Sequence, residues 1–215
     1  MNNFNGQAHQ DKFVLNVLKR KTNGFFLEIG SNDPVHINNS YILESVYNWK
    51  GIMIEYDPKF LPRFQMKRPN SIHVIHDATQ IDYKTLFESN NVPINIDYLQ
   101  IDLEVGNGST IQTLQKLDNE IMNTYKFATV TFEHDIYRSN FLNTRIVSRE
   151  IFSRHGYVCV FEDIEDNGSP YEDWYVHPDL VDMEYVRSLQ SRNASKYSHS
   201  TKHGISCISW QDIEY

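Results

Sequence analysis

Cysteine is scarce in this sequence, and long apolar runs are absent from it. The 215 residues include two cysteines, Cys159 and Cys207, which form no CxxC pair. The sequence therefore predicts neither a zinc knuckle nor a redox motif, and it favours a reducing compartment. No apolar run approaches the roughly 20 residues that a membrane-spanning helix needs. Residues 1–10 lack the charged and apolar regions of a signal peptide, so we expect a cytoplasmic protein without a membrane partner.

Positive charge is also in short supply. Lysine and arginine total 20 against 28 aspartates and glutamates, which gives a formal net charge of −8. Because an acidic protein gains nothing from counterion release on a nucleic-acid duplex, we expect no nucleic-acid partner. A chain of this length can bury its core as one domain. We expect a single domain over residues 1–215, with an N-terminal helix or cap in 1–22 and a C-terminal extension at 179–215.

Short apolar segments alternate with segments of helical periodicity. The apolar segments predict strands over 25–29, 51–55, 71–76, 95–103, 127–132 and 157–161. The periodic segments predict helices over 37–47, 109–119 and 145–155. This alternation, with strands apolar on both faces, indicates an α/β protein with a mainly parallel, covered sheet. Farther along we expect a loop with an edge strand at 174–176, a polar loop over 190–203 and a last strand at 205–210.

Polar and acidic residues follow each of the first five predicted strands. They are Glu28 and residues 30–33, Glu55, Asp77, Asp102 with Glu104, and residues 133–135. Ligands of open parallel sheets bind beyond the carboxyl ends of the strands, so these residues are expected to line one site. Glu55 is the most informative, because a carboxylate that ends the second strand can accept hydrogen bonds from both ribose hydroxyls. A helix cap or a surface carboxylate is the alternative interpretation of Glu55.

The turn after the first strand lacks the glycine repeat of a dinucleotide site. Gly30 is followed by Ser-Asn-Asp-Pro, so no GxGxxG motif is present, and the sequence has no Tyr-xxx-Lys pair. Without the repeated glycines that cradle a pyrophosphate, NAD and FAD are disfavoured. A nucleoside without phosphates, such as S-adenosyl-L-methionine, fits this turn better.

Several segments occur in an order that is typical of one enzyme family. They are GQAHQDKFV, NGFFLEIGSNDP, INNSYILE, WKGIMIEYDP, IHDAT, DYLQIDLE, FATVTFEHD, GYVCVFEDI and EDWYVHP, and they span roughly residues 6 to 178. The set resembles the FkbM family of S-adenosylmethionine-dependent methyltransferases. The resemblance implies a three-layer, Rossmann-like α/β fold with a mostly parallel seven-stranded sheet. It also implies methyl transfer to a hydroxyl of a small molecule or glycan.

The resemblance further implies which residues bind the cofactor. The methionine end would be held by Glu28, Gly30 and Asn32. The ribose and the adenine would contact Glu55, Tyr56, Asp77 and Ala78. Asp102 would face the cofactor amino group or the methyl acceptor.

A hydroxyl acceptor needs a base or a metal ion that exposes its oxygen lone pair. His134 is the first candidate base, with Glu133 and Asp102 beside it, and a structural histidine at a strand end is the alternative. Asp102, Glu133 and His134 could instead hold Mg²⁺ or Ca²⁺. A hydrogen-bonded polar cluster without metal is the alternative to that site.

Glu104, Asp173 and Trp174 are the candidates for acceptor binding. Asp173 lies in a motif typical of the family and would close over the acceptor. Trp174 would stack on a sugar face, with core packing as its alternative. A degenerate methyltransferase fold that binds a nucleoside or a partner protein is the alternative function. The sequence specifies neither the acceptor nor the oligomeric state.

Overall fold

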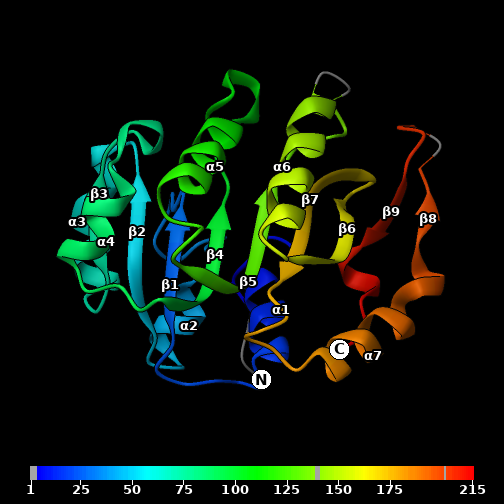
Figure 1. Cartoon of the computed structure of the whole chain (residues 1–215), viewed down its shortest axis with the longest axis horizontal. Coiled ribbons are helices and arrows are strands. Elements are labelled where there is room, and N and C mark those ends of the chain that lie inside the picture. The colour runs from blue at the N-terminus through cyan, green and yellow to red at the C-terminus, as the bar shows by residue number, and fades with distance from the viewer. Residues whose placement is uncertain (1–3, 139–140, 201) are drawn as a thin grey trace.

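The computed structural model describes residues 4–138, 141–200 and 202–215. Its strands are β1 (Phe25–Ile29), β2 (Lys50–Glu55), β3 (Ile72–Ile75), β4 (Asn95–Ile101), β5 (Lys126–Glu133), β6 (Val158–Asp166), β7 (Ser169–Val176), β8 (Ser198–His199) and β9 (Ser206–Ser209). Its helices are α1 (Gln10–Val17), α2 (Tyr41–Ser45), α3 (Leu61–Lys67), α4 (Tyr83–Ser89), α5 (Ser109–Glu120), α6 (Leu142–Arg154) and α7 (Met183–Asn193). Figure 1 shows these elements around one continuous sheet.

Within the described ranges the sheet has nine strands, in the order β3-β2-β1-β4-β5-β7-β6-β9-β8. β1 to β5 are parallel, and β7 is antiparallel to both of its neighbours, β5 and β6. The expected α/β class and mostly parallel sheet are confirmed. The expected count of seven strands is too low, because β9 adds beside β6 and β8 pairs with β9.

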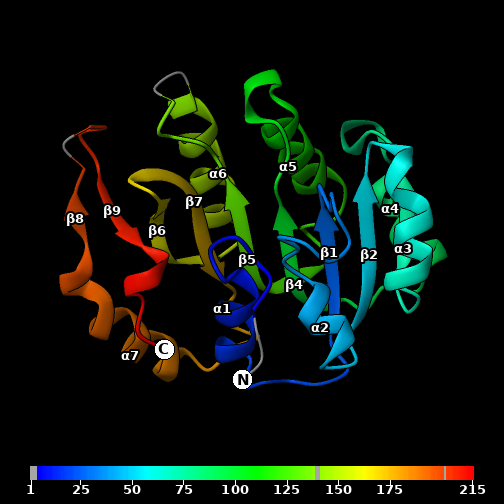
Figure 2. The ribbon, with the colours of Figure 1, turned by 180° about the vertical axis from the view of Figure 1, so that it is seen from behind.

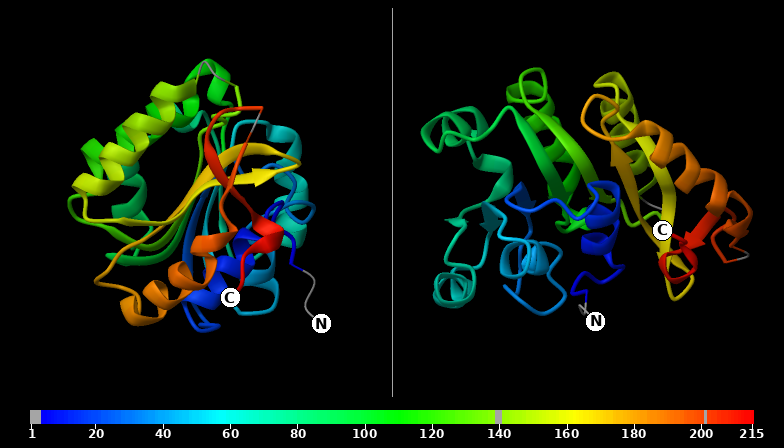
Figure 3. Two further views of the ribbon diagram at one scale, coloured as in Figure 1. Left: turned by 90° about the vertical axis from the view of Figure 1, so that its right-hand side faces the viewer. Right: turned by 90° about the horizontal axis from the view of Figure 1, so that it is seen from below.

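Helices cover both faces of the sheet and produce three layers (Figures 2 and 3). Alternate residues of β1 separate the two halves of the core, since Leu27 packs with α4, α5 and α6 whereas Phe26 packs with α1, α2 and α7. This alternation follows from the two-residue side-chain period of a strand. Among the described helices, none combines the length and apolar content that crossing a bilayer requires.

The C-terminal third differs most from the sequence-based prediction. Residues 162–178 form most of a hairpin of β6 and β7, and β7 lies inside the sheet instead of at its edge. Asn167 and Gly168 make the turn with φ of 52° and 78°, and Asn-Gly is a strong hairpin signal. The prediction of a polar loop over 190–203 is also wrong, because this segment contains the end of α7 and the strand β8.

Candidate active site

Two cavities adjoin at the carboxyl ends of the parallel strands. The larger, which we call the main cavity, has a volume of about 710 Å³ and extends from the loop after β1 to the loop after β5. The smaller, which we call the side cavity, has a volume of about 560 Å³ and lies beyond β2 and β3. Glu55, Leu103 and Glu104 line both cavities. Glu55 therefore stands at the boundary between them.

The Glu55 carboxylate connects the loops that follow β1 and β2. Its Oε2 accepts the backbone N–H of Asn32 at 2.8 Å, and its Oε1 accepts the backbone N–H of Asp57 at 2.9 Å. Each carboxylate oxygen offers more than one lone pair, so Glu55 can still accept hydrogen bonds from a ligand. Asn32 contributes to this arrangement through its backbone, which adopts a positive φ of 47°.

Gly30 is required where the loops after β1 and β4 meet. Its φ is +86°, and a Cβ at this position would lie 1.8 Å from the carbonyl oxygen of Asp102. No L side chain fits such a space, and the backbone conformation favours glycine as well. Glycine is therefore required here because the loop after β4, and not a ligand, lies against Gly30.

Three buried acceptors in the wall of the main cavity lack a hydrogen-bond partner among the described residues. They are Glu28 Oε1, Asn39 Oδ1 and Gln100 Oε1, and each side chain is at most 3% exposed. Glu28 and Gln100 are register partners on β1 and β4, so their side chains lie on the same face of the sheet. Buried acceptors without partners are costly. This wall is therefore suited to a ligand that donates hydrogen bonds.

The side cavity combines an exposed aromatic ring with small and polar groups. Tyr56 exposes 74% of its surface at the cavity wall, and Ala78 lines the same space. Asp77 caps a short 3₁₀ turn, because its Oδ1 accepts from the backbone N–H of Thr79 at 2.9 Å and from the Thr79 hydroxyl at 2.8 Å. A flat base could stack on Tyr56 and approach the Asp77 carboxylate from the cavity.

Carboxylates gather where β4 and β5 end. Asp102, Glu133 and Asp135 all line the main cavity. Burial raises the pKa of Glu133 strongly, and repulsion from Asp102 and Asp135 raises it further. Burial likewise raises the pKa of Asp135. Glu133 therefore favours its protonated form, whereas Asp102 is exposed to solvent in the cavity.

The side chain of His134 does not reach the main cavity or the side cavity. Its side chain is fully buried and lines neither cavity. Its Nε2 lies 3.3 Å from Asp173 and 3.5 Å from Asp163, and its Nδ1 accepts the backbone N–H of Ile136 at 3.2 Å. Side chains alternate at the end of β5, so Glu133 and Asp135 face the cavity while His134 points away. The structure favours the structural alternative for His134.

Of the three predicted metal ligands, Asp102 and Glu133 lie side by side in the main cavity, but His134 points away from them. Among the described residues, the histidine, cysteine or acidic side chains that do converge, within 4.8 Å, are His134, Asp163 and Asp173. Arg145 forms an ion pair with Asp163, and Arg149 does so with both carboxylates. Because these guanidinium groups compensate the two negative charges, the cluster is poorly suited to Mg²⁺ or Ca²⁺.

The candidate acceptor-binding residues on β7 lie in the core. Asp173 is fully buried and accepts from Arg149 Nε at 2.7 Å. The Trp174 ring stacks on Phe13 with 4.7 Å between centroids, and its Nε1 donates to Glu172 at 2.7 Å. Neither lines the cleft, because β7 is inserted between β5 and β6. Of the three candidates, the structure places Glu104 at the cleft.

We expect Glu172→Gln to flatten the pH profile of stability between about pH 4.5 and pH 8. Glu172 is fully buried beside Asp102, and burial raises its pKa from 4.5 to about 8. Because the folded state keeps a proton that the unfolded chain releases, the free energy of unfolding should fall as pH rises from about 4.5 to about 8. Urea denaturation of both proteins across this range measures the effect. The exposed Glu162→Gln variant is the control, and an unchanged slope in Glu172→Gln would contradict this account.

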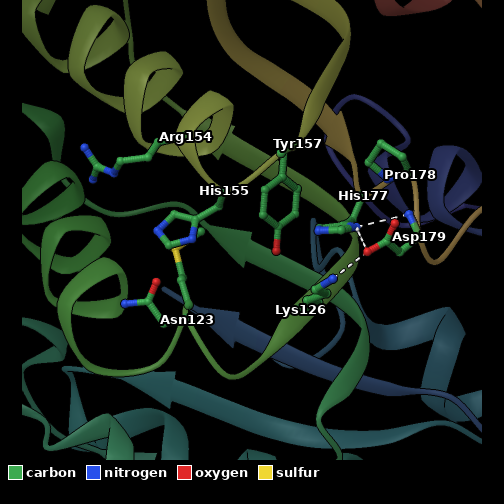
Figure 4. Close-up of a pocket in the computed structure, with 10 residues that line it drawn as sticks. Asn123, Lys126, Arg154, His155, Tyr157, His177, Pro178 and Asp179 are labelled. Carbon is green, nitrogen blue, oxygen red and sulfur yellow. Dashed lines mark hydrogen bonds and ion pairs between the residues drawn. The ribbon is translucent and has the colours of Figure 1, made fainter.

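A third cavity, of about 480 Å³, lies at the opposite end of the sheet (Figure 4). Lys126 begins β5 there, and Tyr157 and His177 flank β6 and β7. Its charged groups pair with one another, since Lys126 Nζ lies 2.5 Å from Asp179 and His177 Nδ1 accepts the backbone N–H of Asp179 at 3.2 Å. This cavity is also remote from the carboxyl ends where sheets of this type bind ligands.

No protein-family model and no curated protein matches the chain. Among solved structures, a protein assigned as an rRNA methylase from Clostridium thermocellum is similar with a TM-score of 0.54 at 10% identity, over 82% of this chain and 99% of that one. A TehB-like SAM-dependent methyltransferase from Corynebacterium glutamicum has a TM-score of 0.49 at 11% identity, over 78% and 86% of the two chains. The first similarity shows that the chain has a Rossmann-like α/β fold.

Proposed function

We propose that this protein transfers a methyl group from S-adenosyl-L-methionine to a hydroxyl of a small molecule or glycan, as the resemblance to the FkbM family implies. The position of Glu55 carries the proposal. This carboxylate ends the second strand and stands between two adjoining cavities. A ribose at Glu55 would direct the adenine into the side cavity and the methionine into the main cavity.

The residues of both cavities fit the two ends of this cofactor. Tyr56, Asp77 and Ala78 offer the side cavity an aromatic ring, an acceptor and a small side chain. In the main cavity, the unpartnered oxygens of Glu28 and Asn39 are acceptors for the cofactor's ammonium group. The ammonium group has three N–H donors and no acceptor, so it matches these buried oxygens.

The bound cofactor would supply an electrophilic methyl group on its sulfonium sulfur. Transfer breaks the S–CH₃ bond, forms an O–CH₃ bond and releases the proton of the acceptor hydroxyl. We assign the uptake of that proton to the Asp102 carboxylate, which is exposed in the main cavity. Glu133, beside Asp102, would orient the acceptor hydroxyl with its own protonated carboxyl.

We expect Glu55→Gln to weaken the binding of S-adenosyl-L-methionine. Loss of charge-assisted hydrogen bonds to the ribose should cost roughly 1.5–3 kcal/mol, which is about 10- to 150-fold in the dissociation constant. Isothermal titration calorimetry measures the constant, and the exposed Glu88→Gln on α4 is the matched control. Equal affinities of wild type and Glu55→Gln would contradict the ribose assignment. Absence of wild-type binding at millimolar cofactor would rule out the proposed function.

A further inference from the structure

One wall of the main cavity carries three carboxyl groups, and among the described residues no basic side chain forms an ion pair with them. Asp102 and Glu133 follow the register pair Ile101–Phe132 on β4 and β5, so they are neighbours, and Asp135 lies two residues beyond Glu133. In the described part of the chain, no lysine, arginine or histidine forms an ion pair with these three carboxylates within 4.0 Å. Arg138 is exposed at the rim, with its guanidinium 5.3 Å from the centroid of the Tyr137 ring.

A buried, unpartnered amide oxygen adjoins the same wall. Gln100 is 3% exposed, and its side-chain nitrogen lies 3.4 Å from Asp102 Oδ2 as the donor of a weak hydrogen bond. This contact fixes the orientation of the amide, because a flipped amide would oppose two acceptors. The Oε1 atom of Gln100 is left without a donor among the described residues. The wall thus presents acceptors that suit a ligand rich in N–H groups, or a cation.

The geometry of the wall favours an organic cation over a metal ion. Mg²⁺ and Ca²⁺ require oxygen ligands that converge on one point at about 2.0–2.6 Å. The ligand atoms of Asp102, Glu133 and Asp135 do not belong to the described set that closes within 4.8 Å. The three residues follow the ends of β4 and β5, two neighbouring strands. Such a row matches the divergent N–H donors of a protonated amine.

We propose that the methyl acceptor carries a protonated amino group, which the Asp135 carboxylate binds with the carbonyl oxygens of Glu133 and Gln100 as further acceptors. This inference rests on the proposed function and narrows its substrate class to amino alcohols, including amino sugars. The amino group anchors the acceptor at the end of β5. Its hydroxyl is then left free to meet Asp102 and the methyl group.

Calorimetry on protein saturated with S-adenosylhomocysteine tests this inference with two matched pairs of probes. The pairs are glucosamine with glucose, and 4-aminobutan-1-ol with butane-1,4-diol. We expect each amine to bind at least about 10-fold more tightly than its neutral counterpart. Asp135→Asn should remove most of that preference, whereas Glu133→Gln, which keeps a carbonyl oxygen, should retain it. Neither variant should change the affinity for S-adenosylhomocysteine. Glu162→Gln, on β6 and outside the cleft, should preserve the amine preference.

The possible outcomes separate the two proposals. If S-adenosylhomocysteine fails to bind, both the proposed function and the amine site are overturned. If it binds but neither amine is preferred over its neutral counterpart, the amine site alone is overturned. A titration with MgCl₂ or CaCl₂ provides the third arm. If the wild type shows no amine preference but binds a metal ion, and Asp135→Asn abolishes that binding, the site holds a metal ion and the amine proposal is overturned.

Discussion

Asp102→Asn is expected to lower kcat by about 10²–10⁴-fold, the usual contribution of a general base. A hydroxyl is a weak nucleophile until its proton departs, and Asp102 is the exposed carboxylate of the cavity wall beside the protonated Glu133. Asparagine keeps the shape of the side chain but cannot take up the proton. The cofactor contacts assigned to Glu28 and Glu55 stay intact, so the dissociation constant of S-adenosyl-L-methionine should change little.

The measurement is kcat against pH at saturating cofactor for both proteins, together with calorimetric cofactor affinity. Asp57→Asn is a matched control, because Asp57 also lines the main cavity but forms an ion pair with Lys59 at 2.6 Å. Its kcat should stay within a few-fold of the wild type. Normal turnover in Asp102→Asn would transfer the role of base to Asp135. Loss of cofactor binding in that variant would show that Asp102 serves the cofactor instead.

Asp173→Ala is expected to destabilise the fold by about 3–5 kcal/mol, because it removes the buried partner of the Arg149 guanidinium and of the Asp163 backbone N–H. Asp173 is fully buried and accepts from Arg149 Nε at 2.7 Å and from Arg149 NH2 at 2.8 Å. It also accepts the backbone N–H of Asp163 at 2.8 Å. The substitution breaks the links that join α6, β6 and β7.

Glu162→Ala is the matched control for this substitution. Glu162 contacts the same Arg149 at 3.2 Å, but 55% of its side chain is exposed, so its loss should cost about 1 kcal/mol or less. Urea denaturation compares the two variants. Equal losses would show that burial does not decide the strength of these pairs. A normal stability with a raised KM for the acceptor would instead restore Asp173 to acceptor binding.

The ion pair between Asp173 and Arg149 also makes the stability of the fold depend on pH in the acidic range. Although burial opposes it, His134 and Arg149 hold the pKa of Asp173 well below its usual range. The unfolded chain therefore binds a proton that the folded state rejects. The stabilisation is present above about pH 4 and decreases as pH falls through the lower, folded-state pKa. Asp173→Ala should accordingly lose less stability than the wild type on acidification.

The sequence by itself determined the strands of the parallel half and the edge of the sheet at which the main and side cavities lie. Apolar runs such as residues 25–29 and 127–132 predicted β1 and β5 because burial on both faces leaves a local signal. Acidic residues after successive strands predicted a site because parallel strands end on the same edge. Glu55 and Asp102 accordingly line the cleft.

The tertiary structure alone decided which polar residues face that cleft. When both faces of a strand are buried, its sequence shows no alternation of apolar and polar residues that would reveal which side chains share a face. The sequence therefore could not predict that Glu133 lines the main cavity whereas His134 points away from it. Asp173 and Trp174 became core residues because β7 pairs with β5, from which it is separated by 39 to 47 positions along the chain. Such a long-range contact leaves no local sequence signal. Gln100 joined the site for a similar reason: its partner Glu28 is distant in sequence, and only the parallel pairing of β1 and β4 places two buried acceptors side by side.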